Sequence, residues 1–175
     1  MHTKAAMIDF QADVLPLRDK IYRLALRITG QKEEAEDVVQ DALLRVWAKL
    51  SDGGEVNDAE AFTLTVARHA ALDAVGRRGR GEVELDESAG QVSAGGGSSP
   101  ARRAEEADRR RWVERIVAEM PEQWRSVLHL RDVEHLSYKK IAEVLEISED
   151  AVRVVIFRAR QRIRKEYEKI ERYGL

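Results

Sequence analysis

A glycine- and serine-rich segment near the middle of the chain constrains the fold more than any other feature of the sequence. From Gly79 to Pro100 the chain reads GRGEVELDESAGQVSAGGGSSP and holds six of the eleven glycines. The segment has no helical periodicity, and small polar residues of this kind are typical of flexible linkers. Fewer than about 100 residues remain on either side, so the sequence predicts two small domains rather than one.

Apolar residues in both halves recur every three or four positions, which is the period of an amphipathic helix. Gly30 is expected to end the first helix, and Pro121 to open one in the second half. Nothing alternates with a period of two, so we predict an all-α fold of two small helical domains. The predicted helices cover residues 15–28, 33 to about 50, 58–75, 101–119, 121–133, 137–145 and 148–167. We place the domains at residues 1–81 and 107–175, joined by a flexible linker at 82–106.

Composition excludes several classes of protein. The chain has no cysteine, which rules out disulfides and thiolate metal sites, and its four histidines lie far apart. No apolar run approaches the roughly 20 residues of a membrane span, and the N-terminus is too polar for a secretory signal. We find no plausible nucleophile, metal cluster or phosphate-binding glycine loop. We therefore expect a cytoplasmic protein that is not an enzyme, inserts into no membrane and needs no metal or cofactor.

The distribution of charge is more informative than the net charge of −2. Residues 82–100 carry four acidic groups and no basic one, whereas residues 101–175 carry eighteen basic and fifteen acidic groups. The C-terminal part is therefore net basic, which suits a nucleic-acid partner better than the whole-chain value suggests.

The strongest local signal is LSYKKIAEVLEISEDAVRVVIFRARQRIRK, from Leu136 to Lys165. Ser137 and Ser148 can each cap a helix, and the two helices are separated only by a tight turn around Ile147. This is the pattern of a helix-turn-helix, whose second helix enters the major groove of DNA. An inert helical hairpin is the alternative, but eight basic against four acidic residues from Lys139 to Lys165 favour DNA binding. The expected buried face of the second helix is Val152, Ile156, Ala159 and Ile163.

Two further stretches extend this pattern into a resemblance. The segment MPEQWRSVLHLRDVEHLSYKKIAEVLEISEDAVRVVIFRARQRIRK resembles region 4 of the extracytoplasmic-function (ECF) sigma factors of bacterial RNA polymerase. Upstream, LALRITGQKEEAEDVVQDALLRVW resembles their region 2, and AFTLTVARHAALDAVGRR resembles the part of region 2 that reads melted DNA. A helix-turn-helix alone is common, but the two regions in this order and at this spacing are specific.

The resemblance implies that the acidic second helix binds the clamp of the largest polymerase subunit. Residues three or four positions apart share one face of a helix, which agrees with that role. The alternative is an ordinary exposed acidic face with no binding role. Trp47 is also the last residue of the predicted apolar stripe of this helix. The implied polymerase-binding residues are Asp37, Gln40, Asp41, Leu44 and Trp47.

The resemblance also implies that the third helix and the loop before it capture unstacked bases of the minus-10 promoter element. Such capture needs a pocket, polar edge contacts and basic groups for the strand. Phe62 fits the helical core better than a stacking position. The implied residues are Val56, Asn57, Asp58, Phe62, Arg68, His69, Asp73, Arg77 and Arg78.

The helix-turn-helix is implied to bind the minus-35 element as duplex DNA. Val154 could contact a thymine methyl, and whether Val155 faces the polymerase or another helix is left open. Glu146 stands where a glycine is customary, so we expect a turn that needs no positive φ angle. The implied residues are Lys139, Lys140, Ser148, Asp150, Arg153, Val154, Phe157 and Arg158.

Together these implications describe a transcription initiation factor. The chain would bind the clamp and flap of core RNA polymerase, bind promoter DNA both as duplex and as single strand, and aid promoter melting. An anti-sigma factor is a further candidate partner. The alternatives are a stand-alone helix-turn-helix regulator and a protein-interaction adaptor without DNA affinity.

Overall fold

The computed structural model describes residues 8–79 and 99–173, and within these ranges it contains helices and loops but no strand. The first half comprises the short helices η1 (Phe10–Val14) and η2 (Leu15–Leu17), then α1 (Arg18–Thr29), α2 (Lys32–Ser51) and α3 (Ala59–Arg78). The second half comprises α4 (Pro100–Ala118), α5 (Glu122–Leu128), η3 (His129–Val133), α6 (Tyr138–Leu145) and α7 (Glu149–Tyr173). The predicted all-α fold is confirmed. Residues 80–98 lie outside the described residues, and these include most of the linker predicted at 82–106. Helix α4 begins within the range assigned to the linker.

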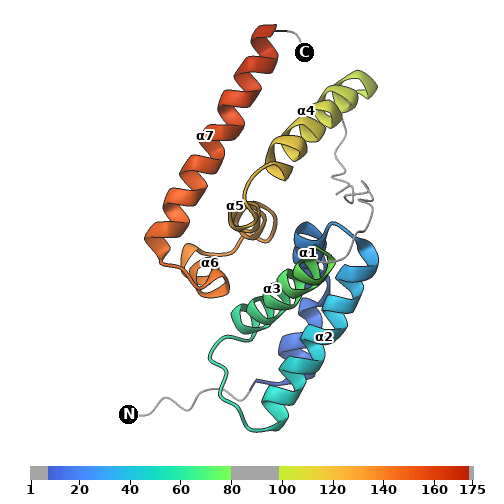
Figure 1. Cartoon of the computed structure of the whole chain (residues 1–175), viewed down its shortest axis with the longest axis vertical. Coiled ribbons are helices and arrows are strands. Elements are labelled where there is room, and N and C mark those ends of the chain that lie inside the picture. The colour runs from blue at the N-terminus through green and yellow to red at the C-terminus, as the bar shows by residue number, and fades with distance from the viewer. Residues whose placement is uncertain (1–7, 80–98, 174–175) are drawn as a thin grey trace.

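Helices α1, α2 and α3 pack against one another as a bundle (Figure 1). Gly30 ends α1 in the left-handed conformation, with φ 71°, and its N–H donates to the Leu26 carbonyl. The side chain of Asp58 caps α3 by accepting a hydrogen bond from the Ala61 N–H at 2.9 Å. These two local signals fix where the helices stop and start, so the apolar faces of all three helices meet in one core.

The second half is built around the long helix α7. Ser137 caps α6 and Ser148 caps α7, each accepting a hydrogen bond from a backbone N–H three residues on. The predicted inward face of α7 is confirmed for Val152, Ile156 and Ala159, which are buried. The C-terminal part of α4 packs against α7, and the two helices share a smaller apolar cluster.

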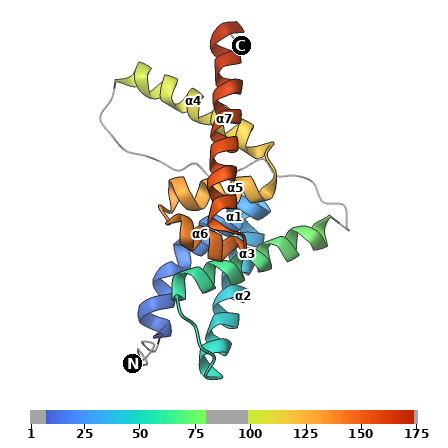
Figure 2. The same cartoon turned by 90° about the vertical axis from the view of Figure 1, so that its left-hand side faces the viewer.

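The two halves do not lie apart. Helix α3 packs against α6 and α1 against α5, so that these four helices form the centre of the molecule (Figure 2). One continuous apolar cluster joins Leu64 of α3 to Leu130 of η3 and to Ile141 of α6. The sequence did not predict this contact between halves, and it determines where several candidate functional side chains point.

Two other kinds of feature are absent from the described residues. No described helix is long and apolar enough to cross a membrane. No histidine and carboxylate side chains in the described ranges gather into a group that could hold a metal ion.

Candidate nucleic-acid interface

The residues with an implied polymerase-binding role share an exposed face of α2. Leu44 is 67% exposed and Trp47 is 55% exposed, although both are large apolar side chains. Asp37 and Gln40 are also exposed, and Asp41 forms an ion pair with Arg45 at 2.8 Å. The expectation that Trp47 also belongs to the buried stripe of its helix is wrong, because the helical core ends at Val46.

The residues with an implied minus-10 role divide into two groups. Asn57, Asp73 and Arg77 are exposed, while Val56 and Phe62 are half-buried. Phe62 therefore lies at the edge of the core rather than inside it.

The other members of this set are engaged within the protein. Arg68 is 11% exposed in its side chain and donates to Glu122 of α5 at 2.9 Å. His69 lies 2.9 Å from the carboxylate of Glu146, in the turn between α6 and α7. Arg78 instead links α3 to α2 and to the end of α1, since it donates to Glu34 at 3.0 Å and to the Thr29 carbonyl at 2.9 Å.

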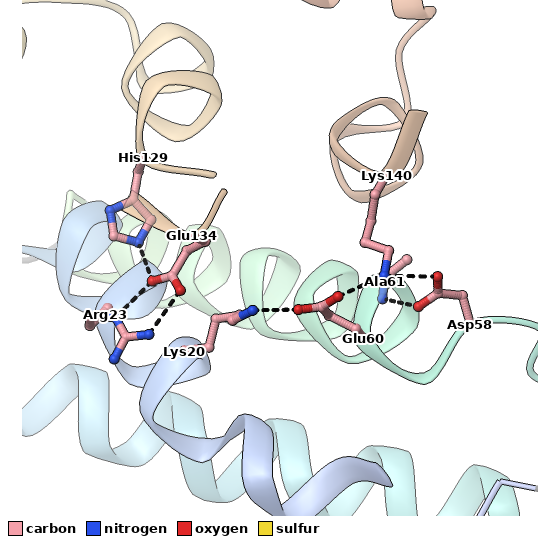
Figure 3. A network of polar contacts seen from close by, with 8 residues as sticks. All are labelled: Lys20, Arg23, Asp58, Glu60, Ala61, His129, Glu134 and Lys140. Atoms are coloured by element: carbon pink, nitrogen blue, oxygen red, sulfur yellow. Dashed lines mark hydrogen bonds and ion pairs between the residues drawn. The ribbon is translucent and has the colours of Figure 1, made fainter. Parts of the chain in front are cut away.

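A cluster of four charged side chains lies where the start of α3 meets α6 (Figure 3). Lys140 Nζ lies 2.6 Å from Glu60 Oε2 and 3.2 Å from Asp58 Oδ2, and Lys20 of α1 binds the second oxygen of Glu60. Burial alone would raise the pKa of Glu60, but its hydrogen bonds to Lys140 and Lys20 lower it. We call Lys20, Asp58, Glu60 and Lys140 the Glu60 cluster.

A second charged contact between the halves is centred on Glu134, whose side chain is 2% exposed (Figure 3). Arg23 of α1 donates to both carboxylate oxygens, at 2.7 and 2.8 Å, and His129 Nε2 lies 3.2 Å from one of them. Burial would raise the pKa of Glu134, but the hydrogen bond and charge of Arg23, aided by His129, lower it to about 2.

The outward face of α7 is accessible. Phe157 is 62% exposed and Val154 is 45% exposed, with Arg153 and Arg158 exposed beside them. Arg153 pairs with Asp150 at 2.7 Å on its own helix. On α6, Lys139 is exposed, whereas Lys140 turns into the Glu60 cluster.

The structure decides between the two orientations left open for Val155 and shows the backbone conformation of Glu146. Val155 is 8% exposed and belongs to the apolar cluster, so it faces other helices of the chain. Glu146 adopts φ 56° and ψ 41°, so the expectation of a turn without a positive φ angle is wrong. The reversal of the chain between α6 and α7 requires the left-handed conformation even though no glycine occupies the position.

Sequence reasoning missed five partners that join the halves, namely Arg23, Glu60, Glu122, Glu134 and Glu146. Each lies 54 to 111 residues from the group that it binds across the interface. It also missed Lys20, which binds Glu60 within the first half, 40 residues away. No local pattern marks such a pair, because each residue looks like an ordinary charged position on a solvated helix face.

Comparisons with known proteins identify one known region in each half of the chain. The model of Sigma-70 region 2 matches residues 14–81, and that of Sigma-70, region 4 matches residues 110–163. The chain is 30% identical over 148 residues to the ECF RNA polymerase sigma factor SigM of Bacillus subtilis, covering 84% of this chain and 88% of that protein. It is also 30% identical over 165 residues to the RNA polymerase sigma-H factor of Pseudomonas aeruginosa, covering 89% of this chain and 84% of that one.

Solved structures share the fold. The sigma factor RpoE in complex with the anti-sigma factor NepR from Bartonella quintana matches with a TM-score of 0.69 at 22% identity, over 91% of this chain and 97% of that one. CnrH in complex with the cytosolic domain of CnrY matches with a TM-score of 0.63 at 20% identity, over 91% of this chain and 88% of that one. At these identities the matches show the fold alone.

Proposed function

The chain belongs to the ECF sigma factors, which are non-enzymatic initiation factors that bind core RNA polymerase and direct it to promoters, and we propose that three of its surfaces carry out this function. The exposed face of α2 binds the polymerase clamp. The loop before α3, with α3 itself, captures bases of the minus-10 element. The outward face of α7 and the start of α6 bind the minus-35 element.

The exposure of Leu44 and Trp47 is the observation that carries the polymerase assignment. The two side chains lie three residues apart on one face of α2 and expose most of their apolar surface. Asp37 and Asp41 border them on the same helix. An apolar pair rimmed by carboxylates is the composition of a protein-binding surface, where the apolar centre is covered and the charged rim sets the orientation.

The DNA assignments rest on charge and on access. Arginines of α7 can reach guanine edges or phosphates in the major groove, and Val154 can contact a thymine methyl. Arg77 and Asn57 are the exposed members of the minus-10 set that can hold a separated strand. Melting would then follow from tighter binding to the open strand than to duplex, with no bond chemistry by this chain.

We assign residues 1–81 to the polymerase- and minus-10-binding domain, 82–106 to the linker and 107–175 to the minus-35-binding domain. The chain acts in the cytoplasm, where the polymerase and its template meet. An anti-sigma factor is a candidate partner of this chain. In the solved structures with the same fold, RpoE is bound to the anti-sigma factor NepR and CnrH to the cytosolic domain of CnrY.

The test of this function replaces Asp41 with arginine. The variant Asp41→Arg reverses the charge of the proposed clamp face at a partly exposed position, so the helix should fold normally. We expect core polymerase to retain at least about tenfold less of the variant, equal to about 1.4 kcal/mol, and run-off transcription to fall with it.

The matched control is Glu105→Arg on α4, which is exposed in the other half and changes net charge by the same amount. It should bind core polymerase as the wild type does. Equal retention of both variants would refute the clamp assignment, and a wild-type chain that supports no run-off transcription would refute the function.

A further inference from the structure

Tyr138, the first residue of α6, lies where three helical elements of the second half meet. It follows the cap residue Ser137, and its half-buried side chain packs against the apolar core. Two arginines approach its ring, Arg131 from η3 and Arg153 from α7, with guanidinium carbons 4.9 and 5.8 Å from the ring centroid. Both distances lie within the roughly 6 Å of a cation–π contact. One aromatic ring therefore connects η3 and α7 to the start of α6.

The contact between Arg131 and the ring is anchored at a second point. Arg131 is half-buried, and its Nη1 donates a hydrogen bond at 2.8 Å to the carbonyl of Leu136, two residues before Tyr138. Leu136 is itself buried in the apolar core. Since Arg131 holds both the ring and the backbone that precedes it, the position of the ring is set by the folded domain and not by DNA.

Arg153 is the DNA-binding side chain that this ring can orient. Its Nη1 lies 2.7 Å from Asp150 Oδ1 and its Nη2 lies 3.6 Å from Glu149 Oε2, both on its own helix. Both carboxylates are exposed to water, Asp150 at 89%, so these pairs are screened and hold the arginine weakly. The half-buried ring of Tyr138 is the more rigid of its neighbours.

The ring and the carboxylates engage different parts of the Arg153 guanidinium. A carboxylate accepts from the N–H donors at the edge of the group, whereas an aromatic ring contacts its flat face and leaves those donors free. An arginine that reads guanine needs two of the donors. Asp150 must therefore release the donor that it holds when Arg153 binds a base, while Tyr138 can keep its contact.

We propose that Tyr138 is a positioning residue for promoter recognition: its ring, fixed by Arg131, holds the Arg153 guanidinium in the orientation that reads the minus-35 element. This inference deepens the proposed function and rests on it. The ring restricts the rotamers of Arg153 before DNA arrives, which lowers the entropy lost on binding. Because one orientation is favoured, the base that Arg153 reads benefits more than the other three. Tyr138 contacts no base in this role.

The experiment uses holoenzyme formed from core polymerase and the full chain, in competition binding over a randomised minus-35 element. Tyr138→Leu and Tyr138→Met remove the ring and keep an apolar side chain against the core. We expect both to lower the preference for the favoured base, at the position that Arg153→Ala affects, by roughly two- to fivefold. The dependence of affinity on salt concentration should stay as in the wild type, because no charge is removed.

Three further variants separate positioning from other roles of Tyr138. Tyr138→Phe keeps the ring and loses only the hydroxyl, so it should retain the wild-type preference. Val144→Ala, at a buried position of the same helix, is the control for a general loss of stability and should leave the preference unchanged. In the double variant, Tyr138→Leu should add little to Arg153→Ala, because the ring then has no guanidinium to orient. Circular dichroism confirms that each variant is folded.

An unchanged preference in both Tyr138→Leu and Tyr138→Met would overturn the positioning role. An equal loss in Tyr138→Phe would do the same, since the hydroxyl would then be the active group, and so would an equal loss in Val144→Ala. Additive effects of Tyr138→Leu and Arg153→Ala would show that the two side chains act independently, which also contradicts the inference.

Failure of the proposed function has a different signature. A wild-type holoenzyme without any preference in the minus-35 element would refute the reading of DNA by α7, and the inference about Tyr138 with it. A preference that Arg153→Ala changes and the ring-removing variants do not would refute the positioning role alone and leave the function of α7 standing.

Discussion

Glu146 has a backbone conformation that its residue type does not indicate in the sequence. It ends α6 with φ 56° and ψ 41°, where a residue with a β-carbon is strained by about 1–2 kcal/mol. Its carboxylate contacts His69, but both side chains are largely exposed, so the pair contributes little to stability. The position therefore combines a strained backbone with a weak side-chain contact.

We expect Glu146→Gly to raise the free energy of unfolding by about 0.5–1 kcal/mol. Glycine relieves the left-handed strain, and the greater freedom it gives the unfolded chain offsets part of the gain. Urea unfolding followed by circular dichroism measures the change. Glu143→Gly, inside α6, is the control and should destabilise the protein by about 1 kcal/mol. A variant Glu146→Gly no more stable than the wild type would mean that the turn is not strained.

At the scale of the element, α7 presents one face to the core and one to solvent. Val152, Ile156 and Ala159 anchor it, so Arg153, Val154 and Phe157 must face outward. Arg153 is held by Asp150, one turn away, whereas Arg158 lies further along the exposed face. The two arginines are thus placed for different contacts along the groove.

We expect Arg153→Ala to relax sequence preference in the minus-35 element and Arg158→Ala to weaken binding to all sequences alike. A bidentate arginine–guanine contact contributes about 1–3 kcal/mol of discrimination, while a lost phosphate contact lowers the salt slope by about one unit. Holoenzyme competition binding over a randomised element, at two salt concentrations, separates these effects. Both variants should still bind core polymerase. If neither variant alters the preference profile, this helix does not read bases.

At the scale of the whole molecule, the stability of the joined halves depends on carboxylates that must stay ionised. Glu134 is the most buried of them, and Arg23 from α1 and His129 from η3 face it. Its pKa falls from 4.5 to about 2 on folding. A carboxylate whose pKa is lowered on folding stabilises the folded state fully above pH 4.5. This stabilisation is lost as the pH falls toward 2.

We therefore expect the free energy of unfolding to decrease between about pH 5 and pH 2 by up to about 3 kcal/mol from this residue. Glu134→Gln should be less stable than the wild type at pH 7 and should lose most of this part of the pH dependence. Glu143→Gln should keep the wild-type profile. Denaturant unfolding at a series of pH values provides the measurement, and parallel profiles for Glu134→Gln and wild type would exclude this role.

The sequence by itself determined the local structure and the faces of the helices. Gly30, Asp58, Ser137 and Ser148 stop or start helices through contacts within four residues, and such signals can be read from the chain alone. Periodicity likewise identified the inward face of α7, and the implied polymerase-binding residues do share an exposed face of α2. These features depend only on neighbours along one helix.

Only the tertiary structure decided how the two halves meet. Periodicity says that a helix has an apolar face, but many helix faces could cover it, and nothing in the spacing of α3 selects α6. Lys140 binds a carboxylate 80 residues away and Arg23 one 111 residues away, so neither pair leaves a local trace. The left-handed backbone conformation of Glu146 was likewise not predicted from the sequence. It follows from the path of the chain between two packed helices. The sequence therefore determines what each surface of this protein offers, and the packing of the halves determines which of those surfaces the free chain exposes.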